Sequence, residues 1–244
     1  MSKTLSGKVA LVTGGSRGIG RAIAERLAQD DAMVIVNYGK SADKAKAVVA
    51  GIEAIGGKAV AIQADMSKVS DVRRVVGETV QRFGRFDILV NNAGMALFKP
   101  LVETTEQEFD EVFALNAKGS YFAMQEAAKV IEDGGRIVNI STDGTHMGFS
   151  GVTVYLGSKG ALEQFTKGLA HELAAKRVTV NTVSPGFTET EMLPDAFREI
   201  GAQMSPLKRV GTAQEIAEVV AFVVSDEARW LTGQNIHAGG GVVM

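Results

Sequence analysis

The sequence predicts an α/β fold: a single domain in which helices cover both faces of a doubly wound parallel sheet of about seven strands. Short apolar runs alternate along the chain with longer segments of helical periodicity, which is the pattern of repeated βα units. The apolar runs are rich in Val and Ile and show little alternation, as expected of parallel strands covered on both faces. No internal repeat, low-complexity segment or long linker divides the 244 residues, so we expect one domain over residues 1–244.

The expected strands are the apolar runs rich in β-branched residues, and helical segments connect them. Strands are predicted at residues 9–12, 33–37, 59–62, 88–90, 136–140, 178–183 and 234–237. Helices are predicted at residues 21–29, through Val72, Val75, Val76 and Val80, and at 106–132, 154–175 and 213–225. Residues 187–209 are more irregular and contain Pro194 and Pro206, so we expect a mobile substrate lid there.

Composition and charge narrow the possible partners. The formal net charge of −2 gives no reason to expect nucleic acid or an acidic membrane. The lack of cysteine excludes disulfides and thiolate nucleophiles, and the 3 histidines show no ligand spacing, so we expect no metal. Residues 1–8 contain no apolar signal region, and no later apolar run reaches membrane-spanning length. We therefore expect a cytoplasmic protein without a membrane partner.

A glycine-rich turn, TGGSRGIG at residues 13–20, follows the first expected strand. Its glycines, Gly14, Gly18 and Gly20, allow a tight turn, close approach of a pyrophosphate and close packing of helix on strand. The helix that starts near Ile19 offers unpaired N–H groups and the positive end of its dipole to an anion. Because a strand precedes the turn and a helix follows it, we interpret it as a dinucleotide-binding turn rather than a plain connection.

The end of the second strand indicates which dinucleotide is bound. An acidic residue there would hydrogen-bond the ribose 2′-hydroxyl of NAD and repel a 2′-phosphate. This chain has no acid at that point. Asn37, Tyr38 and Ser41 could donate hydrogen bonds to a phosphate, and Arg17 or Lys40 could supply charge. The sequence therefore favours NADP(H) over NAD(H).

Tyr155 and Lys159 place a phenol and an ammonium one helical turn apart on the same face. Reduction of a ketone requires a hydride on carbon and a proton on the developing alkoxide. A free phenol has a pKa of about 10, too high for easy exchange at neutral pH. The Lys159 ammonium and the positive nicotinamide ring of an oxidised cofactor would both lower that pKa. Tyr155 is thus the candidate acid, and Lys159 can also hold the ribose hydroxyls.

Further motifs complete a resemblance to a known family. NNAG at residues 91–94 follows the fourth strand, Asn116 lies in the helix after it, and Pro185-Gly186 follows the sixth strand. With the glycine-rich turn and the Tyr155–Lys159 pair in this order, the chain resembles the short-chain dehydrogenase/reductases over essentially its full length. That resemblance implies a Rossmann fold. It is closest to NADPH-dependent ketone reductases, including the hydroxynaphthalene reductases and the 3-oxoacyl-carrier-protein reductases.

The resemblance also assigns roles near the reacting carbonyl. Asn116 matches the position whose side chain and local helix distortion hold a water in a relay towards Lys159. The family usually has a catalytic serine 13 residues before the tyrosine, which here is Thr142, while Ser141 lies at the spacing of 14 that some relatives use. Either hydroxyl could hydrogen-bond the carbonyl and stabilise developing charge. Strand register favours Thr142, and Ser141 remains the alternative.

The cofactor contacts implied by the resemblance involve backbone as well as side chains. Asp65 and Met66 match a pair that contacts adenine, although a solvated loop aspartate is an alternative for Asp65. Thr188 and Thr190 match backbone and hydroxyl contacts to the nicotinamide carboxamide. The full expected set is Gly14, Ser16, Arg17, Gly18, Ile19, Gly20, Asn37, Tyr38, Ser41, Asp65, Met66, Asn91, Ala93, Gly94, Tyr155, Lys159, Pro185, Gly186, Thr188 and Thr190.

The preferred functional hypothesis is an NADPH-dependent ketone reductase acting on a small-molecule ketone or alcohol. A 3-oxoacyl-carrier-protein reductase is the alternative, weakened by the acidic pair Glu132-Asp133 because carrier proteins are themselves acidic. A catalytically weak dinucleotide sensor or structural subunit is supported only by Thr142 in place of serine. The loop that carries Asp143, His146, Met147 and Phe149 could line the pocket, with His146 either a substrate contact or a histidine without a chemical role. The resemblance implies a homotetramer, a dimer of dimers.

Overall fold

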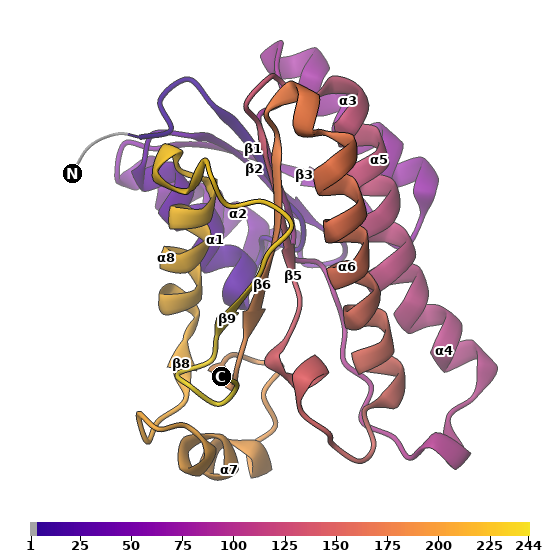
Figure 1. Ribbon diagram of the computed structural model, residues 1–244. Coiled ribbons are helices and arrows are strands. Elements are labelled where there is room, and N and C mark those ends of the chain that lie inside the picture. Colours follow the sequence, from indigo (N-terminus) through magenta and orange to yellow (C-terminus); the bar gives the residue numbers. More distant parts are fainter. Residues whose placement is uncertain (1–3) are drawn as a thin grey trace.

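A parallel sheet of seven strands forms the centre of the molecule, in the order β3-β2-β1-β4-β5-β6-β9, and helices cover both of its faces (Figure 1). The structure, a computed structural model, describes residues 4–244. Residues 1–3, part of the N-terminal segment considered above and of the expected domain, lie outside the described residues. The α/β prediction with a doubly wound parallel sheet is confirmed, because the chain starts at the centre of the sheet and winds outward in both directions.

The observed strands lie within two residues of the predicted ones at either end. They are β1 (Val9–Val12), β2 (Met33–Tyr38), β3 (Lys58–Gln63), β4 (Ile88–Asn91), β5 (Arg136–Ile140), β6 (Thr179–Pro185) and β9 (Asn235–Ala238). Two short strands that were not expected, β7 (Thr188–Glu189) and β8 (Gly211–Thr212), pair with each other apart from the main sheet.

The core lies in two layers, one on each face of the sheet. One face is covered by α1 (Gly18–Gln29), α2 (Ala42–Ala54) and α8 (Ala213–Val224), and the other by α3 (Val69–Phe83), α5 (Ser120–Val130) and α6 (Thr153–Glu172), as Figure 1 shows. Alternate residues of each strand enter opposite layers: Ala10 and Val12 of β1 join the first, and Val9 and Leu11 the second. Both faces of the strands are therefore apolar, which explains the runs without alternation.

Two helical regions differ from the prediction. The predicted helix 106–132 is divided into α4 (Glu106–Phe113), a π-helical turn (Ala114–Gly119) and α5. A Cβ on Gly119 would collide with the carbonyl oxygen of Met66, so the widened turn meets the β3–α3 loop closely. The helix α2 was not predicted, although its buried residues Ala45, Val48 and Ile52 have helical spacing.

The segment predicted as a lid contains β7 and α7 (Ala196–Met204) and lies beyond the carboxyl ends of the strands (Figure 1). Short 3-10 turns occur at Leu101–Glu103, Asp143–His146, Ala174–Lys176 and Asp226–Ala228. Among residues 4–244, no helix is long and apolar enough to cross a membrane.

Candidate active site

A cavity of about 1020 Å³ opens at the carboxyl ends of the strands, where open α/β sheets bind ligands. It extends from the glycine-rich turn, past the ends of β4 and β5, to the segment 187–209. Of the expected cofactor contacts, only Tyr38 and Asn91 do not line it. Ser141, Thr142, Tyr155 and Lys159 line it as well, whereas Asn116 does not.

The glycine-rich turn forms a cradle that side chains would fill. Gly14 and Gly18 have φ angles of +62° and +53°, which L-residues rarely adopt. A Cβ on Gly20 would collide with the carbonyl oxygen of Gly14 and with Nδ2 of Asn92. No side chain caps the N-terminus of α1, and its first turn contains no acidic residue. The N–H groups and the dipole of this helix end thus suit an anion, and the cradle fits a dinucleotide pyrophosphate.

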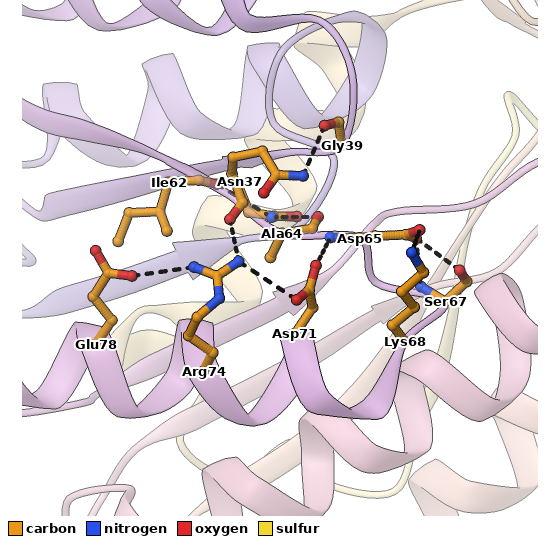
Figure 2. A network of polar contacts seen from close by, with 11 residues as sticks. Asn37, Gly39, Ile62, Ala64, Asp65, Ser67, Lys68, Asp71, Arg74 and Glu78 are labelled. Atoms are coloured by element: carbon orange, nitrogen blue, oxygen red, sulfur yellow. Dashed lines mark hydrogen bonds and ion pairs between the residues drawn. The ribbon is translucent and has the colours of Figure 1, made fainter.

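Asn37 stabilises this cradle instead of offering donors to a ligand. Its Oδ1 accepts a hydrogen bond from N–H of Gly14 (3.2 Å), and its Nδ2 donates to the carbonyl oxygens of Ile62 (3.3 Å) and Ala64 (3.1 Å). Both amide hydrogens are therefore occupied, and the expectation that Asn37 donates to a phosphate does not agree with this geometry. The Asn37 side chain instead connects the glycine-rich turn to the end of β3. Figure 2 shows Asn37 beside Ile62 and Ala64.

Asp65 belongs to the polar network that follows β3 (Figure 2). Its Oδ1 accepts from Oγ (2.7 Å) and N–H (3.1 Å) of Ser67, and its own N–H donates to Oδ2 of Asp71 (2.8 Å). The Ser67 hydroxyl is the main cause that lowers the pKa of Asp65. Asp65 is therefore an ionised carboxylate that Ser67 orients at the edge of the cavity, and its side chain is 42% exposed.

Asn91, by contrast, is buried in the sheet. Its Nδ2 donates to Oδ1 of Asn139 (2.9 Å) and to the carbonyl oxygen of Ser120 (3.5 Å). These bonds connect β4 to β5 and α5. The side chain of Asn91 therefore stabilises the sheet and does not line the cavity.

Tyr155 and Lys159 lie in the first two turns of α6, whose register places both at the cavity. Burial raises the pKa of Tyr155 to about 12, although a hydrogen bond with the Thr142 side chain opposes the rise. Burial also lowers the pKa of Lys159 to about 8, and its Nζ donates to the carbonyl oxygen of Ile140 (2.7 Å). In the protein without its cofactor burial therefore determines the phenol pKa, and the lowering by Lys159 and an oxidised nicotinamide ring stays a prediction.

Ser141 and Thr142 direct their hydroxyls to different places. Ser141 Oγ donates to Oε1 of Glu163 (2.8 Å) and lies 3.4 Å from the carbonyl oxygen of Lys159, so it faces α6. Thr142 Oγ1 accepts from N–H of Gly144 (3.2 Å), and the Thr142 side chain lies near enough to lower the pKa of Tyr155. Successive residues at the end of a strand point to opposite sides, and here only Thr142 meets Tyr155.

Asn116 lies in the π-helical turn and is fully buried. Its Oδ1 accepts from N–H of Met95 (2.9 Å), and its Nδ2 donates to the Met95 carbonyl oxygen (2.8 Å) and to Ser158 Oγ (3.0 Å). A Cβ on Gly94 would lie 3.2 Å from both Asn116 Oδ1 and Lys159 Nζ, so the two groups flank that glycine. The helix distortion expected here is present, and both amide hydrogens of Asn116 are bonded to protein groups, while the water relay stays a prediction.

A carboxylate–imidazole pair that the sequence did not suggest begins in the catalytic loop, residues 143–149, which follows Thr142. Asp143 Oδ1 is 2.6 Å from His237 Nδ1, and Asp143 is 1% exposed. Burial raises the pKa of Asp143, and the hydrogen bond with His237 opposes that rise. The pair joins β9 to the turn after Thr142. No local signal could have indicated it, because the two residues are 94 positions apart.

The far end of the cavity is aromatic. Phe98 stacks on Phe197 with ring centroids 5.8 Å apart, Phe187 lies 6.4 Å from Phe197, and Phe149 meets Phe187 edge-on at 6.1 Å. All four rings line the cavity, together with Met147 and Asp143 of the catalytic loop. His146 does not line it; its ring packs edge-on against that of His237, 4.7 Å away. The structure therefore gives His146 no contact with the pocket. Within residues 4–244, no group of acidic or histidine side chains could hold a metal ion.

A glycine cradle beside the Tyr155–Lys159 pair at the carboxyl edge of a parallel sheet defines the class of protein: a dinucleotide-dependent oxidoreductase. Comparison with known proteins gives the family. A family model described as Enoyl-(Acyl carrier protein) reductase matches residues 14–243. Hydroxynaphthalene reductase arp2 of Aspergillus fumigatus is 43% identical over 246 residues, which span 94% of this chain and 90% of that protein.

Two solved structures agree with this result. A short-chain dehydrogenase from Burkholderia cenocepacia, in complex with NADP, superposes with a TM-score of 0.95 at 43% identity over 98% of this chain and 99% of that one. The angucycline C-6 ketoreductase LanV, with bound NADP, has a TM-score of 0.94 at 42% identity over 99% of this chain and 98% of that one. The present chain belongs to the short-chain dehydrogenase/reductase family.

Proposed function

We propose that this protein is an NADPH-dependent carbonyl reductase that reduces a ketone, with Tyr155 as proton donor and Thr142 as the hydroxyl that binds the carbonyl oxygen. The observation that carries the proposal is that Thr142, Tyr155 and Lys159 line one cavity, where the Thr142 side chain lowers the pKa of Tyr155 and Lys159 lies one helical turn along α6. A carbonyl oxygen placed between the two hydroxyls would receive a hydrogen bond from each.

The cofactor is NADP(H), which supplies the hydride when bound. The N-terminal end of α1 at Gly18–Gly20, which no side chain caps, would hold its pyrophosphate, and Arg17 and Ser41 would face the 2′-phosphate. Asp65 and Met66 would contact the adenine, and Pro185, Gly186, Thr188 and Thr190 the nicotinamide end. No acidic side chain follows β2 to repel the phosphate.

The proton path runs through the chain's own groups. Thr142 accepts its hydrogen bond from Gly144, which leaves its own hydrogen available for the carbonyl oxygen or for Tyr155. Tyr155 gives up its proton to the developing alkoxide. The raised pKa keeps the phenol protonated at neutral pH, so the donor is loaded before the reaction. Lys159 then stabilises the phenolate that remains, since its ammonium lies one turn along the same helix face.

The substrate is a bulky or cyclic ketone. Four phenylalanine rings line the same cavity as Tyr155, and apolar, aromatic walls favour a flat hydrophobic ligand. The names of the relatives agree with this choice, since one is a hydroxynaphthalene reductase and another an angucycline ketoreductase. A 3-oxoacyl thioester is the second candidate, favoured by the description of the family model, which names an acyl carrier protein.

We also propose how the chain is organised into a domain, a lid and an assembly. One domain over residues 1–244 carries a substrate lid at 187–209, and four copies assemble as a dimer of dimers. Exposed aromatic side chains support the assembly: Phe109 and Tyr121 on α4 and α5 are 43% and 45% exposed, and Trp230 is 95% exposed. Light scattering after size exclusion tests the tetramer, and a monomeric mass would contradict it.

The deciding experiment follows the oxidation of NADPH against a panel of cyclic aromatic ketones and a 3-oxoacyl thioester, for the wild type and for Tyr155→Phe. We expect turnover of a cyclic ketone that the variant loses, while the variant still binds NADP⁺. Preference for the thioester would select the second candidate. Binding of NADP⁺ without turnover of any ketone would show a sensor or structural subunit instead.

A further inference from the structure

A carboxylate from the segment 187–209 bridges two cations at the mouth of the cavity. Glu191 Oε2 lies 2.9 Å from Nη1 of Arg17, and Glu191 Oε1 lies 2.6 Å from Nζ of Lys44. Arg17 is the N-cap residue of α1 in the glycine-rich turn, and Lys44 lies in the first turn of α2. Glu191 therefore connects the two elements between which the ribose end of a dinucleotide would lie.

This position coincides with the phosphate site. Arg17, Lys40 and Ser41 line the cavity there, and so does Glu191 itself. A phosphate monoester carries a charge of about −1.5 to −2 at pH 7 and forms its strongest hydrogen bonds with guanidinium groups. The carboxylate of Glu191 and a 2′-phosphate would consequently compete for Arg17 and would repel each other. A dinucleotide without that phosphate would meet no such competition.

We propose that Glu191 is a specificity-determining residue that weakens the binding of NADP(H) relative to NAD(H) by occupying Arg17 and Lys44. The inference rests on Arg17 facing the 2′-phosphate, as stated above. The side chains of Arg17, Lys44 and Glu191 are 59%, 50% and 55% exposed, so water and salt screen both ion pairs. A phosphate can therefore displace the carboxylate, and Glu191 reduces the selectivity for NADP(H) without abolishing it.

The test is a binding measurement without substrate. Dissociation constants of NADP⁺ and NAD⁺ are determined by calorimetry for the wild type, Glu191→Gln and a matched control, Glu189→Gln. Glu189 lies two residues earlier in the same segment, pairs with Arg198 at 2.7 Å and does not line the cavity. In Glu191→Gln we expect NADP⁺ to bind about 3- to 10-fold more tightly and NAD⁺ to change by less than about twofold. Glu189→Gln should change neither constant.

Added salt gives a second readout. The advantage of Glu191→Gln for NADP⁺ should shrink in 0.5 M NaCl, because screening weakens both the ion pairs and the phosphate contact. Weaker binding of NADP⁺ to Glu191→Gln would overturn the proposal, since Glu191 would then be orienting Arg17 for the phosphate. Equal tightening of both dinucleotides, or no change in either, would overturn it as well.

The binding test is independent of the ketone chemistry. If the wild type prefers NADP⁺ and Glu191→Gln does not differ from it, only the role of Glu191 fails, and Tyr155-dependent turnover is unaffected. If the wild type binds both dinucleotides equally, the assignment of Arg17 to the 2′-phosphate fails together with that of Glu191.

Discussion

Ser141 and Thr142 are neighbours in the chain, yet their hydroxyls belong to different parts of the structure. Ser141 donates a hydrogen bond to Glu163 of α6, whereas the Thr142 side chain lies near Tyr155 in the cavity and lowers the pKa of its phenol. Successive side chains of an extended chain point to opposite sides. The Ser141 hydroxyl therefore serves the packing of α6, and the Thr142 hydroxyl is the one near the phenol.

We expect Thr142→Val to lower kcat by about 10²- to 10³-fold, because it removes a donor to the developing oxyanion. Thr142→Ser keeps the hydroxyl and should remain within about tenfold of the wild type. Ser141→Ala should change kcat little and lower the free energy of unfolding by about 1 kcal/mol, the worth of one hydrogen bond. Steady-state kinetics and urea unfolding provide these values. Equal loss of kcat in Thr142→Val and Ser141→Ala would contradict the assignment.

Gly20→Ala should abolish the binding of NADP⁺ and destabilise the protein, because the new Cβ would collide with Gly14 and Asn92. Gly51→Ala is the matched control: it lies on the exposed face of α2, where a Cβ meets nothing within 4 Å. That change should raise the free energy of unfolding by about 0.5–1 kcal/mol through helix propensity and leave binding unaltered. Calorimetry measures the binding of NADP⁺ to both variants, and thermal unfolding measures their stability. Tight binding by Gly20→Ala would show that the glycine-rich turn has room for a Cβ at residue 20.

The lowered pKa of Lys159 predicts a pH-dependent stability. Burial places that pKa at about 8, and an unfolded lysine titrates at about 10.4. Below both values each state holds the proton, and the folded state bears the cost of a buried ammonium. As the pH rises between them, the unfolded state binds more protons, so the wild type gains stability relative to Lys159→Met by up to about 3 kcal/mol. Urea unfolding from about pH 7 to 10 measures this difference, and a constant difference would contradict the prediction.

His237→Leu should lower the free energy of unfolding by about 3 kcal/mol at neutral pH, because it leaves the buried carboxylate of Asp143 without its partner. The pKa of Asp143 is already raised by burial and would rise further without the imidazole. As the pH falls through that raised pKa the carboxyl becomes neutral, so the loss of stability should shrink in acid. His171→Gln, a change on the exposed face of α6, is the control for a lost histidine. Thermal unfolding at several pH values tests the pair, and an equal loss at all of them would show that the Asp143 charge is not involved.

The prediction from sequence was accurate where a few neighbouring residues determine the structure. The strands β1 and β5 were predicted to the residue, because Val- and Ile-rich runs buried on both faces have clear ends. The helix 106–132 was predicted without its π-helical turn, since a π-helical turn changes the hydrogen-bond pattern without a distinctive residue type to indicate it. The same holds for the site residues. Tyr155 and Lys159 were predicted because they share a helix face, whereas the hydrogen-bond partners of Asn37 and Asn116, which are distant in sequence, were not.

By itself the sequence determined the class of fold, the glycine cradle and the spacing of the Tyr155–Lys159 pair, because each depends on backbone geometry within one strand, turn or helix. The tertiary structure alone decided which hydroxyl meets Tyr155, that burial raises the pKa of that phenol, and that Glu191 reaches Arg17. These relationships join residues far apart in the chain. They depend on the order of strands in the sheet and on desolvation within the packed core. The spacing of neighbouring residues in the sequence reveals neither of these.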